Sequence, residues 1–263
     1  AGLHFFNPVP VMKVVEVVDG VLTEPWVGDA LMELARRFGH TPVRCNDTPG
    51  FIVNHAGRGL VPESLRVLSE GIADFATIDR IMMDAAGFRI GPFGLMDLVG
   101  LDVAHAVMKS MYEQYFDEPK YKPFQIAETR VAAGLLGRKT ARGWYTYQDG
   151  AMLAVPEPAA PASQDTSRAD SVWVAPEAST LKDLVSKLGA RIDTGVKPAA
   201  ESLCLVAPIG HDATTTALAL GLDPARTAAV DPLFGFSKRR TLMCNPLTSV
   251  AMRDAAHALL AAD

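Results

Sequence analysis

The sequence predicts a mainly α-helical bundle followed by a small α/β domain. Apolar residues recur at helical spacing through most of the first 147 residues. A stretch rich in Pro, Ala and Ser without apolar periodicity then runs from 148 to 170, as in a linker. Beyond it, short apolar runs alternate with amphipathic ones, which is typical of a parallel sheet with helices. We therefore predict a helical domain over 1–147, a linker over 148–170 and an α/β domain over 171–263.

Helices account for most of the first region. Thr23 occupies an N-cap position, Pro25 falls in the first turn, and an amphipathic run continues to Phe38. Extended segments are expected only at 13–18, at 40–45 and in the tail GWYTY. Apolar-striped helices with short loops are typical of an all-α bundle. The other expected helices are a long one after Gly50, one from Thr77 to Ala86, and two over 96–115 and 124–136.

The region after the linker alternates between the two kinds of element. It contains no GxGxxG after a strand, so it lacks the usual dinucleotide fingerprint. The expected strands lie in VWVA, ARID, SLCLVAPI and RRTLMCN, and the expected helices lie in STLKDLVSKLG, ATTTALALG and VAMRDAAHALLAAD.

Composition excludes several functions. The formal net charge of -5, with no basic cluster, gives no reason to expect nucleic-acid binding. No apolar run is long enough to cross a membrane, and no signal peptide is seen, so we expect a cytoplasmic protein. The three distant cysteines predict buried free thiols in a reducing compartment. The histidines outside the opening stretch show no metal-ligand spacing, so no metal is expected.

The opening stretch LHFFNPVPVMKVVEVV carries the chemistry. A strand over 13–18 places Glu16 between valines, on a face apolar enough to be buried. A carboxylate buried there without a partner would cost several kcal/mol. Two alternatives remain open: Glu16 lies in water on an edge strand, or it meets a histidine.

His4 is the nearest histidine, and the intervening NPVP supplies a turn that could bring the two segments side by side. A carboxylate that holds an imidazole fixes its tautomer and stabilises the imidazolium, which makes a good general base. For His4 taken alone, the alternative to a general base is a purely structural role.

HFFNPVPVMKVVEVV resembles the signature of the L-3-hydroxyacyl-CoA dehydrogenases. The likeness continues through DTPGFIVN, GPFGLMDLVGLD and LGRKTARGWYTY, in order over about the first 147 residues. The resemblance implies the family's helical C-terminal domain, which is similar to that of 6-phosphogluconate dehydrogenase. It implies oxidation of 3-hydroxyacyl-CoA to 3-oxoacyl-CoA with NAD as cofactor, and a homodimer formed through the helical domain.

The resemblance also assigns residues. His4 matches the family's catalytic base, Glu16 the acid that orients it, and Asn54 the asparagine that holds the substrate oxygen. Asn7 matches a residue beside the nicotinamide, and Lys139 a lysine that contacts the dinucleotide. A serine on the far side of the substrate oxygen would lie upstream of the first residue.

Each assignment has a plainer alternative. Asn54 could be a helix-surface or capping residue, and Lys139 could belong to a solvated basic turn. His55 stands where the family often has arginine. GPFGLMDLVGLD is expected to pack, with Leu95, Leu98 and Val99 in the core, and the methionines at helical positions are expected to fill the core.

The NAD-binding domain with its glycine-rich loop is expected to be missing, and the isolated chain is therefore expected to be inactive. Longer members of the family join a degenerate second unit through a linker. The region 171–263 resembles the start of such a unit, with a Rossmann-like fold and a worn Asn-Pro motif at Asn245-Pro246. Aligned on that motif, Leu242 meets His4 and Asp254 meets Glu16.

Two rivals differ from this enzyme. One is a non-catalytic dimerisation or acyl-CoA binding module, since the helical domain also forms the family's dimer interface. The other is a β-hydroxyacid type of dehydrogenase. That type generally uses lysine as acid/base, and the histidine of HFFNP argues against it.

Overall fold

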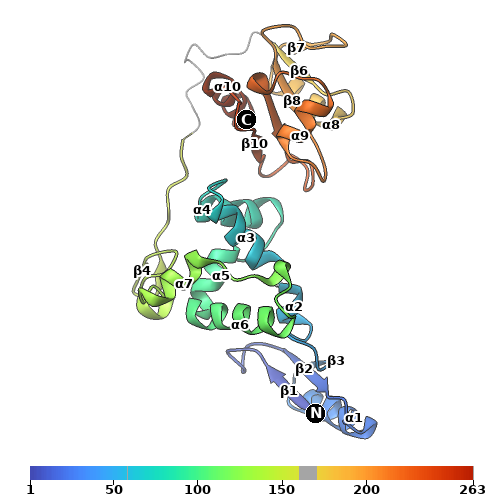
Figure 1. The fold of residues 1–263 in the computed structure, drawn as a ribbon, viewed down its shortest axis with the longest axis vertical. Coiled ribbons are helices and arrows are strands. Elements are labelled where there is room, and N and C mark those ends of the chain that lie inside the picture. The colour runs from blue at the N-terminus through green and yellow to red at the C-terminus, as the bar shows by residue number, and fades with distance from the viewer. Residues whose placement is uncertain (58, 160–170, 263) are drawn as a thin grey trace. The chain divides into compact units, whose positions relative to one another are not determined.

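The computed structural model describes residues 1–57, 59–159 and 171–262, so part of the predicted linker, 160–170, lies outside the described residues. The chain divides into two compact units (Figure 1). Unit 1 comprises Ala1–Ile78 and Pro92–Ala154, and unit 2 comprises Asp79–Gly91 and Val155–Asp263.

Unit 1 begins with a three-stranded sheet in the order β1-β2-β3 (Figure 1). β1 is antiparallel to β2, and β2 is parallel to β3 through helix α1, which packs on both. The expected helical bundle is therefore only part of the first region, and the extended segments expected near 13–18 and 40–45 are confirmed as β2 and β3. Each strand is visible locally, but their pairing joins residues far apart in the sequence. The bounds are β1 Gly2–Phe5, β2 Val14–Asp19, α1 Pro25–Arg37 and β3 Thr41–Asn46.

Helix α1 starts at Pro25, whose fixed φ suits a first helical position. The predicted N-cap at Thr23 is wrong, because the cap residue is Glu24. The Thr23 hydroxyl instead accepts a hydrogen bond from Gly20 N at 3.0 Å, in the turn before the helix.

The helices of unit 1 follow (Figure 1). The long helix expected after Gly50 is two helices, and the one expected from 96 is also two, separated at Gly100, whose φ of +100° no ordinary side chain favours. Asp74, rather than Thr77, caps the next helix, since it accepts from Thr77 N at 2.9 Å. The bounds are α2 Val53–Gly57, α3 Leu60–Ser69, α4 Phe75–Arg80, α5 Pro92–Val99, α6 Leu101–Gln114 and α7 Gln125–Ala132. The end of α4 and the short π-helix Ile81–Ala85 that follows it belong to unit 2.

The hydrophobic core between these helices contains residues of two motifs quoted above, GPFGLMDLVGLD and the tail GWYTY. Phe93, Met96 and Met108 are almost fully buried, and Trp144 packs edge-to-face on Phe93. This confirms a packing role for GPFGLMDLVGLD in part. Leu98 and Val99 are wrong as core residues, being 54% and 50% exposed, because they fall on the outer side of α5.

Asp97 of α5 binds the C-terminal tail of unit 1 through hydrogen bonds. Its buried carboxylate accepts from Trp144 N and Tyr145 N, both at 2.9 Å, and from the Tyr147 hydroxyl at 3.1 Å. Burial raises the pKa of Asp97, while these donors oppose the rise. The tail GWYTY thus has a fixed polar anchor beneath its aromatic side chains.

We predict that Asp97→Asn lowers the free energy of unfolding by about 2–4 kcal/mol. The NH₂ of the asparagine would face N–H or O–H groups that also donate, so at least one buried donor would lose its acceptor. Urea denaturation measures the loss. Asp117→Asn is the control, since Asn tolerates the positive φ of that exposed turn. Equal stability of the two variants would contradict the anchor.

Unit 2 carries a five-stranded sheet in the order β10-β9-β8-β6-β7. Strands β7, β6, β8 and β9 are parallel neighbours, and β10 is antiparallel at the edge. This order of parallel strands is Rossmann-like, as predicted, with an added antiparallel edge. The bounds are β6 Val172–Val174, α8 Ser179–Lys187, β7 Ile192–Asp193, β8 Leu203–Val206, α9 Ala213–Ala219, β9 Thr227–Val230, β10 Leu242–Cys244 and α10 Val250–Leu260. The remaining strands, β4 Tyr147–Gln148 and β5 Ala151–Met152, form a separate hairpin in unit 1.

The sequence did not predict β9. It reads TAAV, poor in the β-branched and aromatic residues that mark strands. All four of its residues are buried between neighbouring strands and helices, where small side chains fit. The Asn245-Pro246 motif follows a strand, β10, as Asn7-Pro8 follows β1. Asp254 lies in α10, however, whereas Glu16 lies in a strand, so the alignment on that motif does not extend to Asp254.

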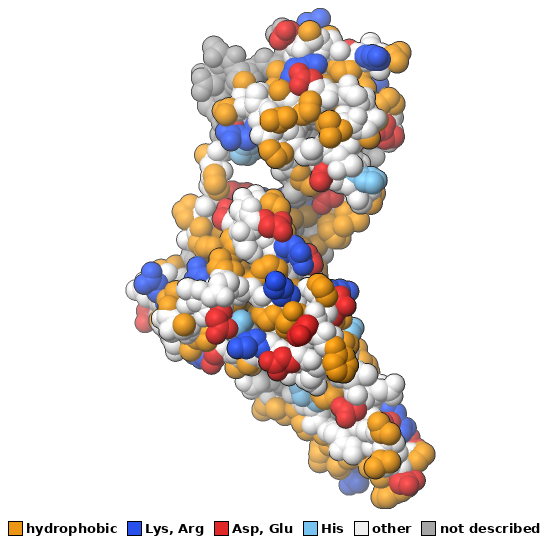
Figure 2. Space-filling model, viewed as in Figure 1, with side chains coloured by type: hydrophobic (Ala, Val, Ile, Leu, Met, Phe, Trp, Pro, Cys, Tyr) orange, Lys and Arg blue, Asp and Glu red, His pale blue; other side chains and the backbone are white. Residues whose placement is uncertain are grey.

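Surface features complete the description. Among the described residues, no helix is long and apolar enough to span a membrane, and no group of three or more His, Cys, Asp or Glu is arranged to hold a metal ion. Acidic and basic side chains are interspersed on the face shown in Figure 2. The cysteines are free, but only Cys204 is buried; Cys45 is half-buried and Cys244 exposed.

Candidate active site

His4 and Glu16 face each other across the β1–β2 pair. They are opposite residues in the antiparallel register, so their side chains leave the same face of the sheet. His4 Nδ1 lies 2.7 Å from Glu16 Oε2. Of the two alternatives for Glu16, the edge strand in water is wrong: β2 is the middle strand and Glu16 is fully buried.

The second oxygen of Glu16 is held by the backbone. Glu16 Oε1 accepts from Ile52 N at 2.9 Å and from Val53 N at 2.8 Å. These N–H groups lie at the start of α2, where the first turn of a helix has no partners of its own. The buried carboxylate therefore has hydrogen bonds on both oxygens, which is the condition for keeping it in a dry site.

The pairing also sets the protonation of the imidazole. Because Nδ1 faces a carboxylate, the neutral ring carries its proton on Nδ1 and leaves a lone pair on Nε2. The His4 side chain is 34% exposed, and its ring packs edge-on against Phe6 and Phe51. The arrangement is a base, oriented by an acid, that is accessible on one side.

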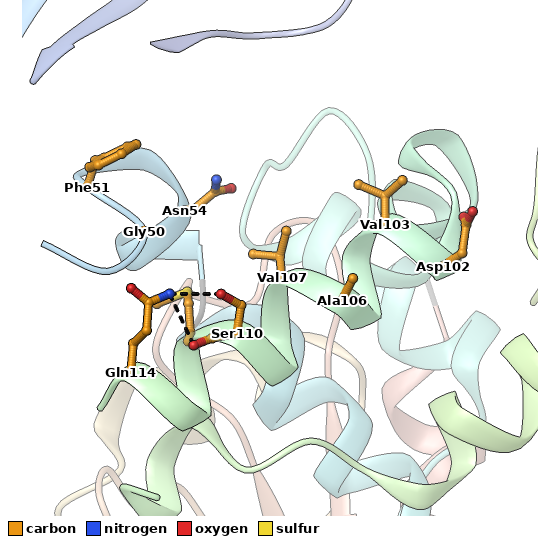
Figure 3. A pocket seen from close by; sticks show the side chains of 10 residues that line it. Gly50, Phe51, Asn54, Asp102, Val103, Ala106, Val107, Ser110 and Gln114 are labelled. Carbon is orange, nitrogen blue, oxygen red and sulfur yellow. Dashed lines mark hydrogen bonds between the residues drawn. The ribbon is translucent and has the colours of Figure 1, made fainter. Parts of the chain in front are cut away.

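Asn54 follows directly after the amides that hold Glu16. Its side chain points into an open groove of about 510 Å³, which α6 lines on the other side (Figure 3). The α6 face is apolar along Val103, Ala106 and Val107. At one end Gln114 Nε2 donates to the Ser110 hydroxyl at 2.8 Å. The groove thus offers an apolar channel that starts at a polar amide.

The two predicted cofactor residues differ. Asn7 lies shortly after β1, the strand that carries His4, and is exposed, and its contact with the nicotinamide stays a prediction. Lys139 Nζ instead lies 2.6 and 2.7 Å from the carboxylate oxygens of Asp102, whose pKa it lowers. The ammonium is therefore already paired within the chain, at the edge of the groove.

Sequence reasoning did not single out the backbone amides of Ile52 and Val53, or Phe51. The Thr-Pro-Gly sequence before them was a usable signal. Pro49 and Gly50 suit the middle of a tight turn, and a turn that leads into a helix leaves N–H groups free to bind a carboxylate.

Fold and site together define a class of protein. A histidine carried by a strand contacts a buried glutamate at the start of a helical domain. Residues 50–147 match the family described as 3-hydroxyacyl-CoA dehydrogenase, C-terminal domain, and residues 1–48 match 3-hydroxyacyl-CoA dehydrogenase, NAD binding domain. Through residues 1–147 the chain belongs to the 3-hydroxyacyl-CoA dehydrogenase family, whose members are NAD-dependent enzymes.

The relatives agree with this family. The 3-hydroxyadipyl-CoA dehydrogenase of Escherichia coli strain K12 is 45% identical over 148 residues, which are 56% of this chain and 31% of that protein. The mitochondrial hydroxyacyl-coenzyme A dehydrogenase of Homo sapiens is 42% identical over 151 residues, 56% of this chain and 47% of that protein. The chain thus spans a third to a half of the length of these two relatives.

One of two similar solved structures extends the likeness to unit 2. A crystal structure of 3-hydroxybutyryl-CoA dehydrogenase from Escherichia coli K12 has a TM-score of 0.72 and 30% identity over 99% of this chain and 50% of its own. An (S)-3-hydroxybutyryl-CoA dehydrogenase from Ralstonia eutropha has a TM-score of 0.54 and 42% identity, over 56% of this chain and 52% of its own.

One expectation is overturned here. The NAD-binding domain was expected to be missing, yet residues 1–48 match it. That expectation depended on the absent glycine-rich loop, whereas β1, β2, α1 and β3 are parts of the same domain that carry no such loop. The expected inactivity of the chain, which depended on the missing domain, loses its support.

We predict that Glu16→Gln lowers kcat for 3-hydroxyacyl-CoA oxidation by about 10²–10⁴-fold, with a much smaller change in KM. With the glutamine oxygen held by Ile52 N and Val53 N, its NH₂ faces Nδ1. The ring proton then moves to Nε2, and the base is lost. Steady-state kinetics of the protein that carries this chain measure the effect. The exposed Glu33→Gln is the control, and a kcat as high as the control's would contradict the role of Glu16.

Proposed function

We propose that this chain supplies the proton-transfer site of an NAD-dependent oxidation of 3-hydroxyacyl-CoA to 3-oxoacyl-CoA. The observation that carries the proposal is the contact of 2.7 Å between His4 Nδ1 and the buried Glu16 carboxylate. This contact leaves Nε2 as the free base on the accessible side of the ring. The family and its printed relatives support the same chemistry.

In this proposal His4 Nε2 takes the proton from the substrate 3-hydroxyl. The imidazolium that forms is stabilised by Glu16, which keeps both oxygens hydrogen-bonded throughout. Asn54, at the mouth of the groove, donates its amide to the substrate oxygen and holds the reacting carbon in place. Because Glu16 keeps the same three partners during the step, the acid needs little reorganisation.

NAD, when bound, accepts the hydride that leaves C3. Among this chain's residues Asn7 fits a contact with the nicotinamide amide, because its own exposed amide can both donate and accept at the end of β1. Lys139 fits less well while Asp102 neutralises it, so we assign it the secondary role of fixing the start of α6. A contact between Lys139 and the dinucleotide stays a prediction.

We further propose that the acyl chain lies in the groove beside Asn54, against the apolar face of α6. The protein is proposed to act as a homodimer through the helical domain, supported by the exposed apolar side chains of Leu98 and Val99 on α5. A cytoplasmic location is kept as part of the proposal. A non-catalytic dimerisation or acyl-CoA binding module would retain the groove but has no need of the His4–Glu16 pair.

The test is NADH formation from 3-hydroxybutyryl-CoA by the protein that carries this chain. His4→Gln should lower kcat by about 10²-fold or more, since the base is removed while the groove is intact. His211→Gln, an exposed histidine of unit 2, is the control. Turnover by His4→Gln equal to the control's would reject the proposed mechanism in favour of the binding module.

We predict that Val107→Phe narrows the groove. The larger ring should lower kcat/KM for an octanoyl-length substrate about tenfold relative to a four-carbon substrate, because only the longer chain must pass α6. The ratio of the two kcat/KM values is the measurement, with the exposed Val196→Phe of unit 2 as control. An unchanged ratio would place the acyl chain elsewhere.

A further inference from the structure

A cluster of aromatic side chains lies against the turn that precedes α2. The Tyr115 hydroxyl is 2.8 Å from His55 Nδ1 and 3.3 Å from the carbonyl oxygen of Pro49. The Tyr121 ring stacks on Tyr115, with ring centroids 4.6 Å apart, and lies 5.9 Å from the His55 ring. Tyr115 thus links both sides of the turn to the C-terminal end of α6.

The backbone of that turn has an unusual conformation at two residues. Phe51 N donates to Thr48 O at 2.9 Å, and both Gly50 and Phe51 have positive φ, +79° and +46°. Positive φ is unfavourable for a bulky residue such as Phe51, so the surroundings must hold it in place. Space is tight as well: a Cβ on Gly50 would lie 3.0 Å from Met111 and from His55 N.

The same turn presents groups that the site uses. It directs Ile52 N and Val53 N to Glu16, places the Phe51 ring 5.4 Å from the His4 ring, and leads into Asn54. A shift of this turn by a few tenths of an ångström would therefore disturb the acid and the oxygen ligand at the same time.

The hydrogen bonds form a chain in one direction. Burial raises the pKa of Tyr115, with a further contribution from Tyr121, so its hydroxyl keeps its proton at neutral pH. A proline carbonyl only accepts, so the hydroxyl donates to Pro49 O and takes its second bond from His55 Nδ1–H. Every group in the chain is then used once.

We propose that Tyr115 and His55 are positioning residues for the proton-transfer site. They hold the turn 48–51, and through it orient the amides that bind Glu16 and the side chain of Asn54. The inference builds on the proposed function. It also gives a role to His55, which stands where the resembling family often has arginine.

The experiment compares four variants of the protein that carries this chain. Tyr115→Phe removes the bridging hydroxyl, and His55→Leu removes the ring nitrogen. His55→Asn keeps a side-chain donor near the position of Nδ1. Tyr112→Phe is the matched control, a tyrosine on the same helix for which the structure shows no hydroxyl hydrogen bond within the described residues. The readouts are kcat, KM, the pH profile and amide hydrogen exchange at Ile52 and Val53.

The positioning role predicts a selective loss. Tyr115→Phe and His55→Leu should lower kcat about threefold to tenfold with little change in KM. The pH profile of kcat/KM should change in these two variants alone, because weaker amide bonds alter the carboxylate that faces His4. His55→Asn should recover most of the activity, and Tyr112→Phe should match the unmodified protein.

Hydrogen exchange tests the positioning role separately from the proposed function. The Ile52 and Val53 amides should exchange about threefold faster or more in Tyr115→Phe and His55→Leu, but not in His55→Asn or Tyr112→Phe. Unchanged exchange and unchanged kcat, or a lower melting temperature alone, would overturn the positioning role. If the unmodified protein oxidised no 3-hydroxyacyl-CoA, the proposed function would fail, and the exchange rates would still decide this inference.

Discussion

The structure of unit 1 depends on one buried carboxylate. Glu16 has no exposed surface, so its charge must be balanced by hydrogen bonds from the protein. His4 supplies one and the amides of Ile52 and Val53 supply two. Removing one of these partners would weaken the hydrogen bonding of a buried charge, at a cost of about 1–3 kcal/mol. The requirement brings together β1, β2 and the start of α2, segments that are distant in the sequence.

These partners come from both sides of a domain boundary. His4 and Glu16 lie in the part that matches the NAD-binding domain, whereas Ile52 and Val53 lie in the part that matches the C-terminal domain. The acid therefore joins the base to the first turn of the helical domain, and the groove beside Asn54 begins at the same turn. One hydrogen-bond network can hold the base and the oxygen ligand in register because they share this support.

Unit 2 has a five-stranded sheet of its own, with a different polar network. At the end of β7, where dinucleotide-binding folds often place an acid for the ribose, Asp193 accepts instead from Gly195 N, Ala199 N and the Ser202 hydroxyl. These bonds within its own loop lower its pKa and occupy both oxygens. The unit keeps an apolar core of strands and helices.

The sequence predicted what depends on local pattern. The valine run around Glu16 identified a strand, and the cost of burying its carboxylate indicated a partner, which proved to be His4. Pairing between distant segments was not predictable in the same way, so the three-stranded sheet and the amides of Ile52 and Val53 were missed. β9 was missed because alanines carry little strand signal, and Leu98 and Val99 were misplaced because periodicity does not say which side of a short helix faces the core.

The most direct test of the central claim is the tautomer of His4, measured by ¹⁵N NMR of the ring nitrogens at a pH where the ring is neutral. The structure predicts that the proton resides on Nδ1, toward Glu16, and that Nε2 is unprotonated and free to accept. A neutral His4 with its proton on Nε2 would contradict the account, because the ring could not then receive a proton from a substrate hydroxyl on its accessible side.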